Sequence, residues 1–423
     1  MMAEQQPHVA HETRVLVIGG GAAGLMAAHT AALYGASVTL FDKNERLGRK
    51  LLITGKGRCN ITNNCDVNTF IANVTTNSRF LYSAANHFTP QDTMRYFESA
   101  GLSLKTERGN RVFPASDRAY DVEAVLEQNV RDSGVQIVTA CVSAILSEQG
   151  SVTGVCCTDG KQYPADAVIV ATGGKSYPLT GSTGDGYRFA SELGHNIVAP
   201  QPSLVPLITE EDWCKKAQGL SLKNVMLTLT DTQTGKELYH ELGEMLFTHF
   251  GVSGPLVLSA SAHIRTMQKN RFKLSIDLKP GLTEKQLDAR ILRDFAANSN
   301  KDFANSLGAL LPRKIIPIII RLSEIPFDIK VNQITKEMRQ KLCIVIKHLE
   351  LTVRDFRPIE EAIITSGGVG VKQVNPKTME SKLVQGLFFA GEVLDLDAYT
   401  GGFNLQIAFS TGYTAGMSAA LQD

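Results

Sequence analysis

The sequence lacks an apolar run long enough to cross a bilayer, which takes about 20 residues. Its longest candidate, residues 315–320, contains Pro317 and is flanked by basic residues. Residues 1–11 are polar and lack the charged-then-apolar order of a secretory signal. These absences predict a cytoplasmic protein with no membrane partner.

The sequence also lacks the cysteine patterns that carry chemistry. Its seven cysteines are irregularly spaced, and no C-x-x-C pair occurs among them. An odd, irregular set argues against a disulfide framework and against a zinc site, so we expect no metal. A flavin-linked disulfide reductase exchanges electrons through two neighbouring thiols, and the missing pair argues against that class of enzyme.

A strong charge of either sign is missing as well. The formal net charge is +1, which gives no overall attraction to nucleic acid or to an anionic membrane. Residues 196–355 nevertheless hold 22 Lys and Arg against 17 Asp and Glu, or +5, whereas the remainder is −4. This asymmetry leans slightly towards an anionic partner but does not decide between an RNA and a small-molecule substrate. The sequence gives no indication of the oligomeric state.

What the sequence does contain is a βαβ beginning with a glycine-rich turn. Residues 14–18 and 37–41 are predicted strands, and the Ala-rich residues between them are a predicted helix. The turn from Gly19 to Gly24 matches G-x-G-x-x-G, and Asp42 follows the second strand. This context predicts a dinucleotide site.

Each residue of this motif has a physical task. Gly19 permits the tight turn, Gly21 lets the backbone approach a pyrophosphate, and Gly24 allows close packing of helix on strand. The N-terminus of the helix offers unpaired N–H groups and a partial positive charge to the phosphates. Asp42 is placed to accept hydrogen bonds from ribose hydroxyls.

The two ends of the chain resemble each other in character, and the middle differs. After residue 358 the sequence returns to a strand, a Gly-rich turn and a helix, whereas the region between 196 and 355 turns to short β-like stretches and then to helical patterns. A chain of 423 residues is expected to form two or three domains. We therefore predict an α/β fold in which residues 1–195 and 356–423 form one Rossmann-like domain around an insertion.

Several motifs resemble those of a known family. Gly48 to Asn60 is similar to G-[RK]-K-x-L-x-[ST]-G-x-G-R-C-N, the signature of a bacterial flavoprotein family. That family contains bile-acid 3-dehydro-4,6-ene reductases and ribosomal-RNA dihydrouridine synthases, and an aminoacetone oxidase has been assigned to it. Residues 246–255, 365–369, 391–395 and 401–406 also resemble its motifs. The resemblance covers residues 14–420, and Lys56 departs from it where Gly is commoner.

The resemblance implies an FAD cofactor and divides the insertion into a β-barrel-like part, 196–280, and a helical part, 281–355. A second dinucleotide turn is missing, so NAD(P)H is expected to act as a transient electron donor without a Rossmann domain of its own. The expected cofactor contacts are Gly19, Gly21, Ala23, Gly24, Asp42, Lys43, Arg49, Lys50, Arg58, Cys59, Asn60, Val142, Thr172, Gly173, Gly174, Gly391, Glu392, Asp395, Gly402, Asn404 and Leu405.

Three residues are candidate proton donors. The Cys59 thiol could protonate a carbon while hydride arrives from a flavin, or it could be a small packing residue. The His249 ring could act as an acid or bind substrate, or it could hold a turn by hydrogen bonds. Tyr399 could donate a proton or form a stacking wall.

The leading functional hypothesis is an NAD(P)H-driven, FAD-dependent reductase of a C=C bond conjugated to a carbonyl group. A steroid or bile-acid enone and the 5,6 bond of uridine in ribosomal RNA share this chemistry. Two alternatives stay open: an amine oxidase that uses oxygen, and a non-catalytic flavoprotein that binds RNA or senses redox state.

Overall fold

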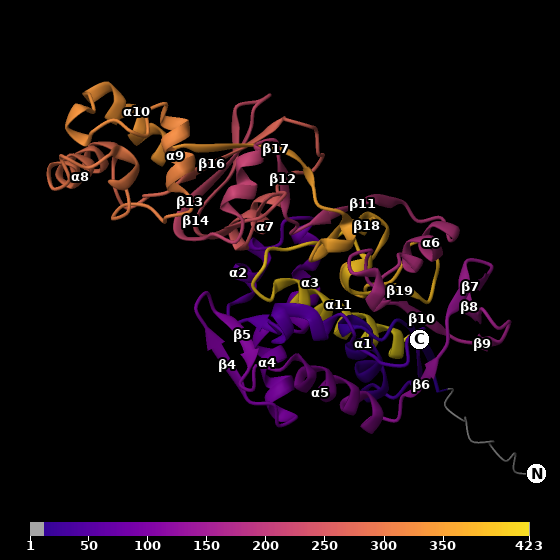
Figure 1. Ribbon diagram of the computed structural model, residues 1–423. Coiled ribbons are helices and arrows are strands. Elements are labelled where there is room, and N and C mark those ends of the chain that lie inside the picture. The colour runs from indigo at the N-terminus through magenta and orange to yellow at the C-terminus, as the bar shows by residue number, and fades with distance from the viewer. Residues whose placement is uncertain (1–11, 423) are drawn as a thin grey trace, which may run out of the picture. The chain divides into compact units, whose positions relative to one another are not determined.

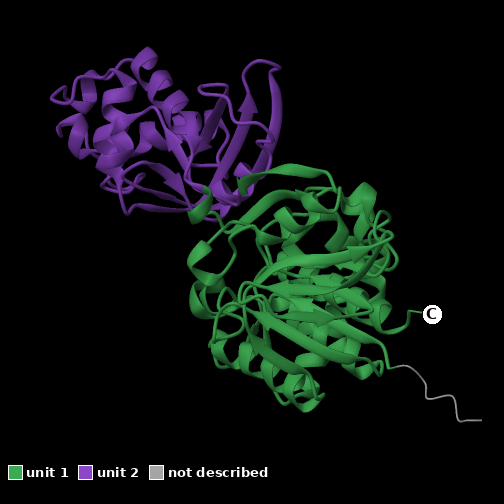
Figure 2. Cartoon of the chain, turned by 90° about the vertical axis from the view of Figure 1, so that its right-hand side faces the viewer, with its two compact units in different colours: residues 1–202, 359–423 green, residues 203–358 purple. Residues whose placement is uncertain are grey.

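The computed structural model describes residues 12–422 (Figure 1). The chain divides into two compact units, shown in different colours in Figure 2. Unit 1 contains the residues up to 202 and those from 359 onwards, and unit 2 contains residues 203–358. Unit 1 is therefore assembled from the two ends of the chain, with unit 2 inserted between them.

A parallel sheet of five strands forms the centre of unit 1. Its order is β19 (Leu387–Phe389), β10 (Ala167–Val170), β1 (Arg14–Ile18), β2 (Ser37–Asp42), β6 (Gln136–Thr139). The inner strands β1 and β10 carry short apolar runs that are buried almost completely, as expected for strands covered on both faces. All four strand pairs are parallel, so the carboxyl ends of the strands lie along one edge.

The strand order reverses at β1. The chain first adds β2 and β6 on one side of β1 and then places β10 and β19 on the other side. In open parallel sheets, such a reversal leaves a crevice at the carboxyl ends of the two strands that flank it, and ligands bind there. The predicted dinucleotide turn follows β1, so it lies at this point of the fold.

Two helices from opposite ends of the sequence pack against each other in unit 1. α1 (Ala22–Leu33) and α11 (Phe403–Ala420) make extensive contact. A side chain added at Gly412 or Gly416 would collide with backbone oxygens of α1, so small residues allow the close approach. This packing ties the C-terminal helix to the beginning of the Rossmann-like domain.

Smaller elements surround this core in unit 1. The helices are α2 (Val67–Ala72), α3 (Tyr82–His87), α4 (Pro90–Ser99), α5 (Ala119–Asp132) and α6 (Asp185–Glu192). The remaining strands are β3 (Thr62–Asn63), β4 (Leu104–Glu107), β5 (Arg111–Pro114), β7 (Val142–Glu148), β8 (Ser151–Cys157), β9 (Gln162–Pro164), β11 (Ile197–Ser203) and β18 (Ile364–Val369).

Unit 2 contains a closed six-stranded barrel. Its order is β12 (Leu207–Thr209), β15 (Gly251–Ser253), β14 (Lys236–Phe247), β13 (Ser221–Asp231), β16 (Phe272–Asp277), β17 (Leu349–Phe356). Its helices are α7 (Pro255–Ser261), α8 (Glu284–Ala296), α9 (Ile316–Ser323) and α10 (Lys336–Lys347). β17 follows these helices in sequence and closes the barrel by pairing with β16 and β12.

The predicted fold class is confirmed, because a Rossmann-like domain carries an inserted barrel and helices. Within the region that sequence patterns assign to helices, residues 349–355 instead belong to the barrel strand β17. Their alternating burial is the period of a half-buried strand. No helix within residues 12–422 is long and apolar enough to span a membrane.

Candidate functional site

The turn between β1 and α1 uses its glycines in three different ways. Gly19 has φ +103°, and a Cβ there would lie 2.6 Å from the carbonyl oxygen of Ala171, just beyond β10. A Cβ at Gly24 would collide with the carbonyl oxygen of Gly19. A Cβ at Gly21 would meet nothing within 4 Å. Two glycines are thus required by packing, and the third leaves open space at the N-terminus of α1.

This open space suits a diphosphate. Gly21 is the residue immediately before α1. Because it lacks a side chain, it forms no capping hydrogen bond with the N-terminus of the helix. The first N–H groups of a helix have no partner within the helix, and they favour an anion. Ala23 lies in the same first turn. The residues present therefore fit the pyrophosphate of a dinucleotide.

Asp42 ends β2 beside this turn. One carboxylate oxygen accepts a hydrogen bond from the Gly20 N–H at 2.7 Å. The other accepts from the backbone and side-chain N–H groups of Asn44 at 2.8 and 3.0 Å. The carboxylate thus couples the end of β2 to the Gly-rich turn.

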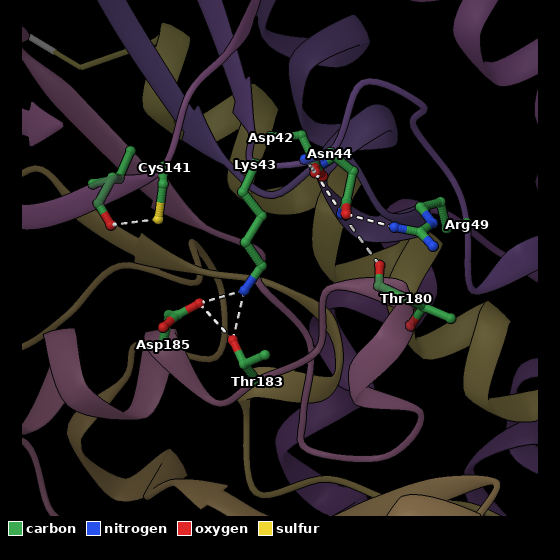
Figure 3. A network of polar contacts seen from close by, with 10 residues as sticks. Asp42, Lys43, Asn44, Arg49, Cys141, Thr180, Thr183 and Asp185 are labelled. Carbon is green, nitrogen blue, oxygen red and sulfur yellow. Dashed lines mark hydrogen bonds and ion pairs between the residues drawn. The ribbon is translucent and has the colours of Figure 1, made fainter. Parts of the chain in front are cut away.

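The network around Asp42 extends to Lys43 and Arg49 (Figure 3). The Lys43 ammonium lies 2.7 Å from a carboxylate oxygen of Asp185, and Arg49 donates to the Asn44 side-chain oxygen at 2.7 Å. The Asn44 amide in turn donates to the carbonyl oxygen of Thr180 at 3.3 Å. Segments around residues 42–49 and 180–185 are therefore joined beside the end of β2.

Four segments, among them loops after strands on both sides of β1, meet at one ion pair. The Lys50 ammonium lies 2.7 Å from Glu392 Oε2 and donates to the Ser176 hydroxyl at 2.6 Å. Glu392 Oε1 accepts from the Thr365 N–H at 2.8 Å and from the Ser176 hydroxyl at 3.2 Å. We call Lys50, Ser176, Thr365 and Glu392 the Lys50–Glu392 cluster.

The turn after β10 packs against this cluster. A Cβ at Gly174 would collide with the Thr365 hydroxyl and lie 2.9 Å from Glu392 Oε1. Gly173 has φ +72°, a conformation that favours glycine. The neighbouring Thr172 hydroxyl is buried and has no hydrogen-bond partner within residues 12–422. A hydroxyl in that state is a ready contact for a bound group.

The loop after β19 begins with Gly391, whose φ is +75°. A Cβ at this glycine would lie 2.7 Å from the Cβ of Ala23, in the first turn of α1. Further along the loop, Asn77 donates to a carboxylate oxygen of Asp395 at 2.9 Å. The loop carrying Glu392 and Asp395 therefore contacts the helix end that bounds the open space.

The N-terminus of α11 is held by asparagines. The Asn60 side-chain oxygen faces the Gly402 N–H and accepts a hydrogen bond from it at 2.9 Å. The side-chain nitrogen donates to the carbonyl oxygens of Val112 and Thr62. Asn404 donates to the carbonyl oxygen of Ala398 at 2.8 Å and accepts from its N–H at 2.9 Å. Leu405 lies in the same first helical turn, partly exposed.

Cys59 is completely buried, with φ +58°. Burial raises the pKa of its thiol to about 12, although the neighbouring Thr54 opposes this shift. The group is therefore a neutral thiol near pH 7. It could donate a proton, but it is not a thiolate nucleophile.

Arg58 faces two carboxylates. Its guanidinium pairs with Glu107 and with Asp117, the latter at 2.6 Å, and lies 4.1 Å from the centre of the Phe113 ring. The hydrogen bonds to Glu107 and Asp117 raise the pKa of Arg58 further. Its charge is thus compensated by Glu107 of β4 and by Asp117, which lies beyond the end of β5. Val142, at the start of β7, is buried and pairs with Cys157 of β8.

The remaining two candidate donors lie in different units. Tyr399 belongs to unit 1, where its N–H donates to the carbonyl oxygen of Asn73 at 3.0 Å. His249 belongs to unit 2, in the turn between β14 and β15, and its exposed ring packs edge-on against Phe250 at 5.0 Å. The Arg357 guanidinium lies 4.6 Å from the centre of the same Phe250 ring.

Sequence reasoning missed Ser176 and the role of Thr365. Ser176 follows Thr172-Gly173-Gly174 by two residues, and Thr365 opens the T-x-G-G-V motif. Both lie inside or beside motifs that the sequence does reveal. Their hydroxyls could not be connected to Glu392 without knowing which loops meet.

Comparison with known proteins agrees with this architecture. A family model described as the HI0933-like protein Rossmann domain matches residues 13–418. The 3-dehydro-bile acid delta(4,6)-reductase of Clostridium scindens is 33% identical, over 96% of this chain and 99% of that protein. The ribosomal RNA dihydrouridine synthase of Haemophilus influenzae is 32% identical, over 96% and 98%.

A solved structure shares the fold. The 3-ketosteroid-delta4-(5alpha)-dehydrogenase from Rhodococcus jostii RHA1 superposes with a TM-score of 0.53 at 15% identity, covering 98% of each chain. The family match extends over almost all of the described residues and both units. The chain therefore belongs to the HI0933-like Rossmann family of FAD-dependent oxidoreductases, as the signature at residues 48–60 predicts.

Proposed function

We propose that the protein binds FAD in unit 1 and uses it to reduce a C=C bond conjugated to a carbonyl group. The observation that carries this proposal is the open space at Gly21, because Gly19 and Gly24 are required by packing and Gly21 is not. A backbone without a side chain at the N-terminus of a helix is the arrangement that a dinucleotide pyrophosphate needs.

The sheet topology suggests which end of the cofactor lies where. Asp42 ends β2 and Lys43 and Arg49 follow it, on one side of β1, and we assign them to the adenosine half. The loops after β10 and β19 lie on the other side, and we assign them to the flavin half. The proposed contacts of that half are Lys50, Asn60, Thr172, Gly173, Gly174, Gly391, Asp395, Gly402, Asn404 and Leu405, and Glu392 supports them through its ion pair with Lys50.

Bound FAD supplies hydride-transfer chemistry, with NAD(P)H as the proposed electron source. The names of the two relatives support the substrate class. One is a reductase of a 3-dehydro bile acid, and the other forms dihydrouridine in ribosomal RNA. Both reactions saturate a C=C bond that is conjugated to a carbonyl group. The charge that develops on the carbonyl oxygen requires a hydrogen-bond donor, and the α carbon requires a proton.

We propose Cys59, His249 and Tyr399 as the residues to test for that proton. Cys59 is a candidate because its neutral thiol can give a proton. His249 is a candidate because its ring is exposed and accessible to solvent. Replacement of the true donor by Ala should slow substrate reduction by about 10²–10⁴-fold. Reduction of the bound flavin by NADPH should keep its rate, because that step needs no proton from this residue.

The decisive experiment uses the purified protein with NADPH under anaerobic conditions. Ribosomal RNA from a strain that lacks the protein and a steroid dienone are offered in parallel reactions, and dihydrouridine and reduced steroid are measured by mass spectrometry. We expect one of the two to be reduced. Formation of dihydrouridine identifies an RNA-modifying enzyme, and reduction of the dienone alone identifies a small-molecule reductase.

Protein without NADPH and a Gly21→Val variant, whose added side chain enters the space proposed for the pyrophosphate, serve as controls. If neither substrate is reduced by protein that carries FAD, the proposed reaction is wrong. Oxygen consumption with a small amine would then favour an oxidase.

A further inference from the structure

The Lys50–Glu392 cluster joins four segments that are far apart in the sequence. Lys50 comes from the loop after β2, Ser176 from the loop after β10, Thr365 from β18, and Glu392 from the loop after β19. The Ser176 and Lys175 N–H groups also donate to the Thr365 hydroxyl, at 3.2 and 2.8 Å. Every distance in the cluster is that of a direct hydrogen bond.

The cluster lies next to the proposed cofactor cradle. The loop that carries Lys50 is held by the Gly48 N–H, which donates to the carbonyl oxygen of Gly20 at 2.8 Å. Gly391, the neighbour of Glu392, lies against Ala23 in the first turn of α1. Both members of the ion pair are therefore one or two residues away from a direct contact with the glycine-rich turn or helix α1.

The Lys50–Glu392 ion pair is partly shielded from water, so removal of one of its two charges has a strong electrostatic effect on neighbouring groups. The side chains of Lys50 and Glu392 are only 23% and 16% exposed. Charges that are partly removed from water are screened weakly, so an unbalanced one acts on neighbouring groups over several ångströms.

We propose that Lys50 and Glu392 are a positioning pair for the redox half of the cofactor, which they hold in a locally neutral environment. This inference rests on the proposed function. In this arrangement, Glu392 acts on the cofactor through Lys50, Ser176 and Thr365 and does not bind the cofactor directly. The pair has two effects: it holds the loops after β2, β10 and β19 together, and it balances one positive against one negative charge.

The two effects predict different results for single and double variants. Reduction adds negative charge to a cofactor, so a nearby cation raises its reduction potential and a nearby anion lowers it. Lys50→Met leaves Glu392 unbalanced and should lower the potential. Glu392→Gln leaves Lys50 unbalanced and should raise it, while the amide oxygen can still accept from Thr365.

The Lys50→Met/Glu392→Gln double variant tests the pairing. Its reduction potential should return close to that of the wild type, because no unbalanced charge remains. Each single variant should bind FAD at least about tenfold more weakly than the wild type, since it leaves a partly buried charge unpaired. The double variant should recover most of that loss.

The experiment titrates the full-length apoprotein with FAD and follows flavin fluorescence, and it measures the reduction potential by equilibration with a redox dye. Circular dichroism and thermal unfolding of each apoprotein establish that the variants fold. Arg14→Met is the matched control. Arg14 pairs with Asp166 at 2.8 Å, with more exposed side chains (44% and 30%) and at the amino end of the sheet, so the potential should not change.

Shifts of the two single variants in the same direction, or no shift in either, would overturn the inference. A double variant whose reduction potential equals that of one of the single variants would overturn the inference as well. A wild-type protein that takes up no FAD overturns the proposed function instead, and this inference falls with it.

Discussion

Three glycines in one turn illustrate how a single added side chain can test the site. A Cβ at Gly21 meets nothing, whereas one at Gly24 collides with the Gly19 backbone. We expect Gly21→Val to fold normally and to bind FAD at least about tenfold more weakly, because the new side chain occupies the space proposed for the pyrophosphate. Gly24→Val should lose about 3 kcal/mol of unfolding free energy through overpacking.

Chemical denaturation of the apoproteins and FAD titration separate these two effects. Gly281→Val is a suitable control, because a Cβ at Gly281 also meets nothing within 4 Å and this residue lies in unit 2. It should change neither stability nor affinity. Wild-type FAD affinity in Gly21→Val would contradict the assignment of the cradle.

The buried Cys59 thiol makes stability depend on pH in the alkaline range. Its pKa in the folded protein is about 12, above the ordinary value of 9.0, so the folded state retains a proton that the unfolded state loses. The stabilising contribution is complete below pH 9 and is lost as the pH rises towards 12. The melting temperature should therefore fall over this range.

Cys59→Ala should reduce the fall of the melting temperature at alkaline pH. Thermal unfolding followed by circular dichroism between about pH 8 and pH 11 measures it, and the values above about pH 9 are the informative ones. Cys141→Ala, at a partly exposed cysteine, should keep the wild-type slope. An unchanged slope in Cys59→Ala would show that this thiol does not contribute. Other buried thiols with raised pKa values, Cys65, Cys214 and Cys343, explain why some loss should persist.

At the scale of an element, the position of helix α11 depends on one buried side chain, that of Gln406. The Gln406 oxygen accepts from the hydroxyls of Thr62 and Thr93 at 2.6 and 2.8 Å. Its nitrogen donates to the Phe88 carbonyl and the Ser410 hydroxyl at 3.1 and 3.0 Å. All four hydrogen bonds are internal, so this residue of the C-terminal motif holds the helix in place.

Gln406→Leu should therefore destabilise the protein by about 1–3 kcal/mol, because buried hydroxyls lose their acceptor. Thermal unfolding measures the effect. Gln128→Leu, on the exposed side of α5, should have an effect near zero. Equal stability of the two variants would contradict the role assigned to Gln406.

The same elements show what sequence patterns can predict. The β1 turn and the strand before Asp42 were predictable, because short apolar runs and glycine spacing depend on neighbours in the chain. The extent of β17 was not, since its strand character comes from pairing with β16 and β12, which lie far away in sequence. Arg58 was predicted as a cofactor contact from its motif, and only the fold reveals Glu107 and Asp117 beside it.

At the scale of the whole molecule, unit 2 is entered and left at one place. The Arg357 N–H donates to the carbonyl oxygen of Pro206 at 3.0 Å, and β12 pairs with β17. Replacing residues 203–358 by a short Gly-Ser linker should therefore leave unit 1 able to fold. The shortened protein should still bind FAD, because Gly21, Lys50 and Glu392 all lie in unit 1.

Flavin absorbance after gel filtration tests this expectation. The shortened protein should have lost substrate reduction, since His249 and the rest of the insertion are gone. The same shortened protein carrying Gly21→Val provides the control and should elute without flavin. Elution of the first variant without flavin would show that unit 2 is needed for cofactor binding.

The charge asymmetry of the chain belongs to this scale as well. Unit 2 holds 23 Lys and Arg against 17 Asp and Glu, a net charge of +6, whereas unit 1 with its termini is −5. Many of these cations are paired, for example Arg271 with Asp231 and Lys347 with Asp277. These pairs already cancel within the net charge, and the remaining +6 is modest for a unit of this length.

The sequence by itself determined the glycine-rich turn after the first strand, the family and the fold class. These features depend on glycine spacing, on apolar periodicity and on motifs that are local in the chain. Only the tertiary structure decided which loops meet: that Glu392 pairs with Lys50, that Arg58 is compensated by two carboxylates, and that Cys59 is buried as a neutral thiol. The physical reason is that charge pairing and burial depend on neighbours brought together by folding, and no local pattern records those neighbours.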